Sequence, residues 1–168
     1  MIRVLVINII KFIFLVLIQV LILNRLSIGG VIHPMLYILF IITLPFETPR
    51  WLIIALGFIM GLTIDFFSDT LGIHAASTTF LAFVIPIIWR LLSSHDGYEL
   101  GESPQINVQG IKWFLRYAIV VSLIHNITFF FIEAFSLEFF FSTLWSATLN
   151  TLFTVVLIIL SQLLVIKK

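Results

Sequence analysis

The sequence predicts an all-α integral membrane protein, folded as a polytopic bundle of about six transmembrane helices. Its 168 residues are 61% hydrophobic and only 10% charged, whereas soluble domains are nearer half apolar and a quarter charged. Long apolar runs recur along the chain, and several approach the ~20 residues that a helix needs to cross a bilayer. Lysines and arginines gather in alternate connections between these runs. Composition therefore excludes a water-soluble fold.

The expected spans follow the apolar runs in chain order, and the whole chain, 1–168, is expected to form one membrane domain. A first span at 4–23 exceeds the apolar region of a signal peptide, about 7–15 residues, so we expect it to be retained. The next run, 35–46, is short and bounded by prolines, which predicts a short crossing or a re-entrant segment. Further spans are expected at 51–67, 74–92, 113–132 and 142–166, with a hydrophilic cytoplasmic loop at 93–110.

The positions of lysine and arginine predict the orientation, because cytoplasmic connections are enriched in both. With six spans and a cytoplasmic N-terminus, Arg25 lies outside and Lys11 lies within a span. The residues then on the cytoplasmic side are Arg3, Arg50, Arg90, Lys112, Arg116, Lys167 and Lys168. If 35–46 is re-entrant, the N-terminus lies outside, and Arg3 and Arg25 exchange sides. In both arrangements the turns around Asp69 and 133–138 face outward.

The stretch GFIMGLTIDFFSDTLGIH, at 57–74, places two glycines and two acids in an otherwise apolar region. Gly57, Gly61, Asp65 and Asp69 recur every four residues, so on a helix they form one stripe. The first two make a GxxxG pattern, which allows membrane helices to approach closely. The following span opens with HAASTTF, which is also small and polar. The stretch therefore predicts a tightly packed helical hairpin.

Each of these residues has a structural and a functional interpretation. Asp69 suits an N-cap or turn acid before the 74–92 span. Asp65 suits an interfacial acid that hydrogen-bonds to neighbouring hydroxyl groups. The GxxxG pattern alone favours ordinary packing within the chain. Ionisable groups inside membrane spans are nevertheless costly and usually functional, so the stripe is also a candidate site for packing or partner interaction.

A second polar pair, His125 and Asn126, lies within the 113–132 span. A buried histidine can relay protons or bind a substrate, although such a pair more often hydrogen-bonds to another helix. In the last span, Asn150, Thr151 and Thr154 are expected to link helices by hydrogen bonds. We keep His125 and Asn126 as secondary candidates.

No catalytic or metal-binding motif is present. The chain lacks HExxH, GxSxG and Walker patterns, and it contains no cysteine. Two carboxylates four residues apart, in a helix rim and a turn, make a poor acid–base pair. The net charge of +1 gives no electrostatic footprint for nucleic acid. We therefore expect no enzyme activity, no metal site and no cofactor.

The hairpin resembles that of the MreD family of bacterial rod-shape-determining membrane proteins. The resemblance rests on G-x-x-x-G-x-x-x-D, a short turn with glycine, and a span that starts with small residues. The matching positions are Gly57, Gly61, Asp65, Gly72 and 74–79. They cover roughly 30 residues, and the outer spans match only in hydropathy and number.

The resemblance implies a non-catalytic, multi-pass subunit of the cell-elongation machinery in the bacterial cytoplasmic (inner) membrane. It would support cell shape and lateral peptidoglycan synthesis. The implied partners are an MreC-type protein, the MreB filament, directly or indirectly, and a RodA-type polymerase with its transpeptidase.

MreD proteins are also similar to the six-helix S components of energy-coupling-factor vitamin transporters. An S component is therefore the alternative, and the absence of an obvious outward polar pocket in the sequence weighs against it. A flippase or ion-coupled carrier is a third possibility, which rests on Asp65 and His125.

Overall fold

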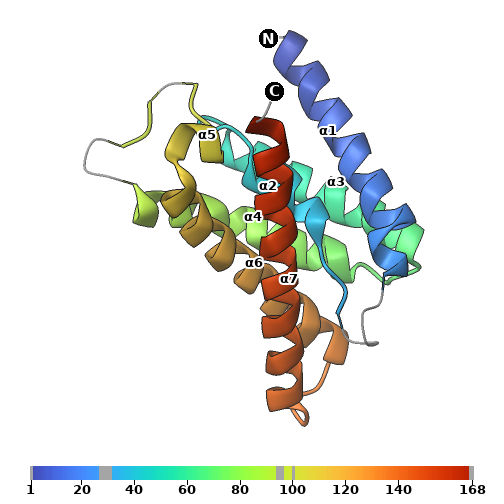
Figure 1. The fold of residues 1–168 in the computed structure, drawn as a ribbon. Helices are drawn as coiled ribbons and strands as arrows, with labels where there is room; N and C mark the ends of the chain where they lie inside the picture. Colours follow the sequence, from blue (N-terminus) through green and yellow to red (C-terminus); the bar gives the residue numbers. More distant parts are fainter. Residues whose placement is uncertain (1, 27–31, 94–96, 100, 167–168) are drawn as a thin grey trace.

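The computed structural model describes residues 2–26, 32–93, 97–99 and 101–166. These residues are largely helical and contain no β-strand. Five of the helices are long and apolar enough to cross a membrane, and Figure 1 shows them as an oblique bundle. The protein is therefore an all-helical membrane protein. The side chains of Arg3, Lys167 and Lys168, which entered the predicted charge balance, lie outside this description.

The bounds of the long helices lie within two residues of the predicted spans, since apolar length sets both. The long helices are α1 (Ile2–Leu21), α3 (Arg50–Ser68), α4 (Ile73–Leu92), α6 (Ile111–Ala134) and α7 (Phe140–Ile166). Four short elements connect them: η1 (Leu23–Arg25), η2 (Leu36–Ile38), α2 (Leu39–Ile42) and α5 (Ile106–Gln109).

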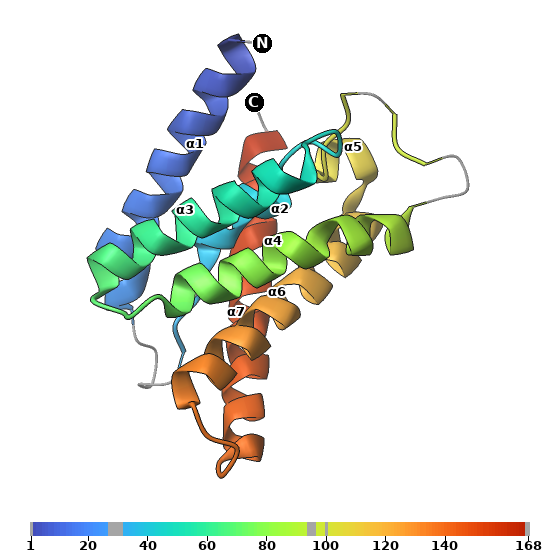
Figure 2. The ribbon, with the colours of Figure 1, turned by 180° about the vertical axis from the view of Figure 1, so that it is seen from behind.

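The long helices pack in chain order around a central segment. α3 lies along α4, α4 along α6, and α6 along α7, while α1 packs on α3. Figure 2 shows α3, α4 and α6 side by side, with α7 and α2 behind them. We call the end of the bundle with the α3–α4 and α6–α7 turns the outer end. The opposite end, with α5, is the inner end. Both names follow the orientation expected from the sequence.

The 35–46 run differs from a sixth transmembrane helix. It forms only η2 and α2, and their residues are almost completely buried. The segment runs antiparallel to α1: Tyr37 bonds Gln19 near its start, and Lys11 bonds Thr43 near its end. Phe46 then reaches the inner end, where its N–H donates to the carbonyl of Glu102 at 3.2 Å.

The chain therefore passes from the outer to the inner end of the bundle through this segment, which favours the short-crossing alternative over the re-entrant one. The predicted bundle of about six helices becomes five long helices and one short buried pass. The start of α1 and the end of α7 consequently lie at the same end of the molecule (Figures 1 and 2).

Side chains of α1 and α7 make this irregular pass possible. Non-helical backbone is tolerated at membrane depth only where protein groups satisfy its hydrogen bonds. The Gln19 side chain of α1 satisfies both a backbone carbonyl and a backbone N–H of the pass, because its amide group donates as well as accepts hydrogen bonds. The bonds are His33 N–H to Asn150 Oδ1 (2.6 Å), Met35 N–H to Thr154 Oγ1 (3.0 Å), Tyr37 N–H to Gln19 Oε1 (3.3 Å) and Gln19 Nε2 to the Pro34 carbonyl (3.0 Å).

At the inner end, the connection between α4 and α6 folds back onto the bundle. Tyr98 stacks on Phe46 at 3.7 Å between ring centroids, and its hydroxyl donates to the Trp89 carbonyl at 2.8 Å. Burial raises the pKa of the Tyr98 phenol to about 12, so the group stays a neutral donor. Tyr98 thus fastens the predicted 93–110 loop to the bundle. Ser94, a position in this loop that the sequence places in the cytoplasm, lies outside the described residues.

Candidate functional site

Asp65, in the last turn of α3, caps the first turn of α4. Its Oδ1 accepts the His74 backbone N–H at 3.1 Å, and its Oδ2 accepts the Ala75 N–H at 2.8 Å. Thr70, in the intervening turn, donates its hydroxyl to Oδ1 at 2.5 Å. The first N–H groups of a helix lack partners within it, and a carboxylate there also opposes the helix dipole. One acid thereby fixes the next helix across the turn.

Of the two structural alternatives for Asp69, an N-cap of α4 or a turn acid, the structure shows the turn acid. Asp69 ends α3 in a left-handed conformation with φ 57°, and its N–H donates to the Asp65 carbonyl. Its side chain is exposed. The N-cap position of α4 belongs to Gly72, which has φ 88° and supplies no side-chain bond. Asp65 can take over the capping function because the two left-handed residues turn α4 back beside it.

The two helix glycines bring α3 against α4. A Cβ at Gly61 would lie 2.5 Å from the Ala75 Cα and 2.5 Å from the His74 carbonyl oxygen. A Cβ at Gly57 would lie 2.7 Å from the Ala82 Cβ. Only hydrogen fits at these distances. The GxxxG pattern therefore packs within the chain, and it brings Asp65 within reach of the first turn of α4.

His74 lies against the same carboxylate and faces the interior. Its Nδ1 is 3.1 Å from Asp65 Oδ1 and 3.1 Å from Thr70 Oγ1. Because an ionised carboxylate only accepts hydrogen bonds, this geometry favours the proton on Nδ1. The ring packs 4.7 Å from Phe129 and 5.7 Å from Tyr37, measured between centroids. His74 thus connects the hairpin to α6 and to the short pass.

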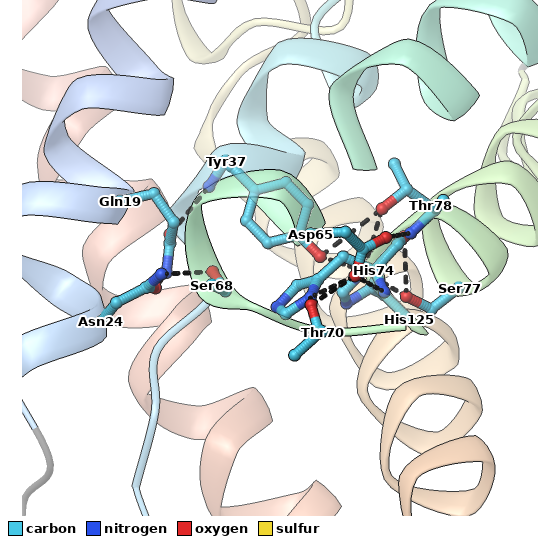
Figure 3. A network of polar contacts seen from close by, with 11 residues as sticks. Gln19, Asn24, Tyr37, Asp65, Ser68, Thr70, His74, Ser77, Thr78 and His125 are labelled. Carbon is cyan, nitrogen blue, oxygen red and sulfur yellow. Dashed lines mark hydrogen bonds and ion pairs between the residues drawn. The ribbon is translucent and has the colours of Figure 1, made fainter. Parts of the chain in front are cut away.

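His125 of α6 occupies the centre of this cluster and is fully buried. Its Nε2 lies 3.0 Å from the Tyr37 hydroxyl, 3.3 Å from Ser77 Oγ and 3.4 Å from Thr78 Oγ1. Figure 3 shows these hydroxyl groups converging on the ring from α4 and the short pass. His125 therefore joins three separate parts of the chain. Among the described residues, no hydrogen bond links His125 directly to Asp65. His74 lies between them, and Tyr37, Ser77 and Phe129 each contact both His74 and His125.

Asn126 points toward α7. Its Nδ2 donates to Thr151 Oγ1 at 3.2 Å and to the Ser122 carbonyl at 2.9 Å. This matches the expected hydrogen bond between helices. In the described part of the chain, three buried atoms on this side of α6 lack a partner: Ser122 Oγ, His125 Nδ1 and Asn126 Oδ1.

The network continues from the short pass to α1. Gln19 Nε2 lies 2.9 Å from Asn24 Oδ1, and Asn24 Nδ2 donates to Ser68 Oγ at 2.7 Å (Figure 3). Sequence reasoning did not single out Gln19 or Tyr37 as site residues. The sequence did contain a signal for both, because each is a polar residue inside an apolar run, Gln19 in 4–23 and Tyr37 in 35–46.

The hydrogen bonds of this cluster connect several helices to one another. Both oxygens of Asp65 are engaged by donors from the hairpin itself. Across the described ranges, no three metal-ligating acids or histidines gather. The cluster fastens α3, α4, α6 and the short pass to one another near the outer end.

A separate outer pocket lies between the outer ends of α6 and α7, with a volume of about 400 Å³. We define it by its lining residues, which are His33, Phe130, Glu133, Ala134, Ser142, Thr143 and Ser146. Five of the seven are polar. The sequence had shown no obvious outward polar pocket, because the polar residues at the ends of α6 and α7 are interspersed with apolar ones and His33 lies far away in the chain.

No match was found among protein-family models, curated proteins or solved structures. The resemblance to the MreD family therefore rests on the hairpin motif.

Proposed function

We propose that the protein is a non-catalytic subunit of a bacterial cell-elongation complex, of the MreD type. The carrying observation is that the residues of the resembling motif form one closed structural unit. Gly57 and Gly61 bring α3 onto α4, Asp65 caps α4, and Gly72 makes the turn between them. The motif thus builds a closely packed hairpin, which supports a structural role for its residues. A protein of this kind acts through the surface that it presents to other membrane proteins.

The face of this hairpin that points away from the rest of the bundle is apolar. A shallow groove of about 600 Å³ runs along α3 and α4 and is lined mainly by Ile54, Phe58, Leu62, Ala76, Phe80 and Phe83. In the bilayer such a face contacts lipid or another transmembrane helix. The proposed partners are an MreC-type protein, the MreB filament, and a RodA-type polymerase with its transpeptidase.

The proposal is tested by depleting the protein in its own cells. We expect rods to round up and lateral incorporation of fluorescent peptidoglycan precursors to fall. An affinity-tagged copy should restore both and should purify with an MreC-type protein. Cells that stay rod-shaped after depletion, with a tagged copy that purifies with transporter ATPases, would contradict the proposal.

The outer pocket favours a second candidate, the S component of an energy-coupling-factor transporter. A small solute entering from outside would meet five polar residues in a cavity of about 400 Å³, within the size range of ligand pockets. Measuring vitamin uptake distinguishes the two candidates. An S component accumulates a labelled vitamin only with its ATPase partners, whereas an elongation subunit leaves vitamin uptake unchanged when it is depleted.

A further inference from the structure

The outer pocket holds polar side chains that have no hydrogen-bond partner in the described part of the chain. There, no residue donates a hydrogen bond to the Glu133 carboxylate or lies within ion-pair distance of it, although His33 of the same lining interacts with it electrostatically. The hydroxyls of Ser142 and Ser146 also make no hydrogen bond to a described residue, and Glu133 and Ser142 are exposed. The other polar residues in these helices mostly bond to their own backbone or to a neighbour, as Thr151 does. Glu133, Ser142 and Ser146 instead line one cavity.

The charge of this region selects the sign of a ligand. Glu133 is the only acidic residue among the seven that line the pocket. Asp69 and Glu138 lie in the neighbouring outer turns, whereas Arg25 is the only lysine or arginine that the described residues place at this end. Like charges focus a field that attracts counter-ions to a cleft. The only other ionisable side chain in the lining is His33, which interacts electrostatically with Glu133. Histidine is neutral or positive and the carboxylate brings the only negative charge, so an anionic ligand would be repelled by Glu133 and a cationic group is favoured.

The lining then distinguishes between kinds of cation. A primary ammonium has three N–H donors. The Glu133 carboxylate would take its charge and one bond, and hydroxyl oxygens of Ser142 and Ser146 would accept the others. Quaternary ammonium groups are usually held by several aromatic faces, but Phe130 is the only aromatic carbocycle in the lining. A bare metal ion would find too few ligands.

We propose that the outer pocket binds a primary ammonium group, with Glu133 as its counter-ion. The group can belong to a small soluble amine or to a lipid head group, because the pocket opens at the outer rim of two membrane helices. This inference goes beyond the elongation function and does not depend on it.

The test uses the purified full-length chain in detergent and native mass spectrometry. The probes are phosphatidylethanolamine, phosphatidylcholine with the same acyl chains, and free ethanolamine. We expect the ethanolamine lipid to be retained over the choline lipid. Glu133→Gln should reduce this preference about tenfold, since a hydrogen bond to a charged group contributes roughly 1.5–3 kcal/mol.

Glu138→Gln is the matched control, because Glu138 lies in the same outer turn but does not line the pocket. It should leave the preference unchanged. Should Glu133→Gln not fold, the double variant Ser142→Ala, Ser146→Ala replaces it, with a smaller loss expected.

Free ethanolamine separates the two sources. Glu133-dependent binding of ethanolamine alone supports a soluble amine, whereas lipid retention without it supports a head group. Equal retention of both lipids together with no ethanolamine binding, or a preference that Glu133→Gln leaves intact, would overturn the proposal. Neither result bears on cell shape, so the elongation function stands or falls separately.

Discussion

Asp65 shows how a carboxylate near the end of a membrane span can have its hydrogen-bonding needs met by the next helix. It is 3% exposed, and a buried charge is tolerated only when it is fully hydrogen-bonded. Here the first turn of α4 and Thr70 supply those donors. The acid and the helix terminus compensate each other, because N–H groups at a helix start also need acceptors.

Replacing Asp65 tests this role at the residue scale. Asp65→Ala leaves the His74 and Ala75 N–H groups buried without an acceptor and should destabilise the protein by about 1–3 kcal/mol. Asp65→Asn keeps one oxygen acceptor and should be clearly milder, because asparagine caps helices nearly as well as aspartate. Thermal unfolding in detergent and rescue of rod shape are the measurements. Complete loss of function in both variants, at normal protein levels, would favour an ion-coupled carrier.

A second prediction concerns Gln19, whose side-chain amide hydrogen-bonds to two backbone groups of the short pass. Gln19→Leu removes the partner of the Tyr37 N–H and of the Pro34 carbonyl. Each unsatisfied group costs about 1–3 kcal/mol when buried, so less folded protein should accumulate. Fluorescence-detected gel filtration measures this. Thr148→Val is the control, since the Thr148 hydroxyl bonds only within its own helix. Equal accumulation of both variants would contradict the role assigned to Gln19.

At the scale of elements, the α3–α4 hairpin depends on backbone contact. A Cβ added at Gly61 would lie 2.5 Å from backbone atoms of α4, whereas the atom nearest to a Cβ added at Gly57 is the Ala82 methyl carbon, at 2.7 Å. Backbone cannot give way without moving the whole helix. The two glycines therefore tolerate bulk to different degrees.

We expect Gly61→Ala to lower the melting temperature more than Gly57→Ala, and either leucine variant to abolish accumulation of folded protein. Overpacking typically costs about 1–3 kcal/mol, which outweighs the ~1 kcal/mol gained in helix propensity. Gly101→Ala, in the inner loop with no atom near its Cβ, tests the cost of a positive φ alone. Normal accumulation of both leucine variants, with unchanged melting, would exclude the close approach.

The elements that the sequence predicted well are those set by local pattern. Apolar length predicted the long helices, and the four-residue spacing of Gly57, Gly61 and Asp65 predicted the tight hairpin. The capping role of Asp65 depends on where the turn places α4, so the sequence predicted only hydroxyl partners for Asp65 and left Asp69 open as an N-cap or a turn acid. The buried pass at 35–46 depends on Gln19, Asn150 and Thr154, which lie far away in the chain. No local pattern reveals such partners.

For the whole molecule, the short pass determines at which end of the bundle α1 begins. The Asn24 side chain donates to Ser68 at the end of α3, so the end of α1 lies beside the outer turn. A re-entrant 35–46 segment would instead put it at the inner end. We expect the outer end to face away from the cytoplasm, because the described residues place few lysines and arginines there.

Single cysteines decide between these arrangements, and the absence of native cysteine makes the labelling clean. In intact cells or spheroplasts, an impermeant maleimide should label Leu26→Cys and Ser136→Cys, because both positions are exposed and belong to the outer end. Ser103→Cys, at the inner end, should react only after the membrane is opened. Labelling of Ser103→Cys from outside would invert the whole protein. Protection of Leu26→Cys with normal labelling of Ser136→Cys would be more specific: it would place the end of α1 inside and restore the re-entrant segment, against the bond between Asn24 and Ser68.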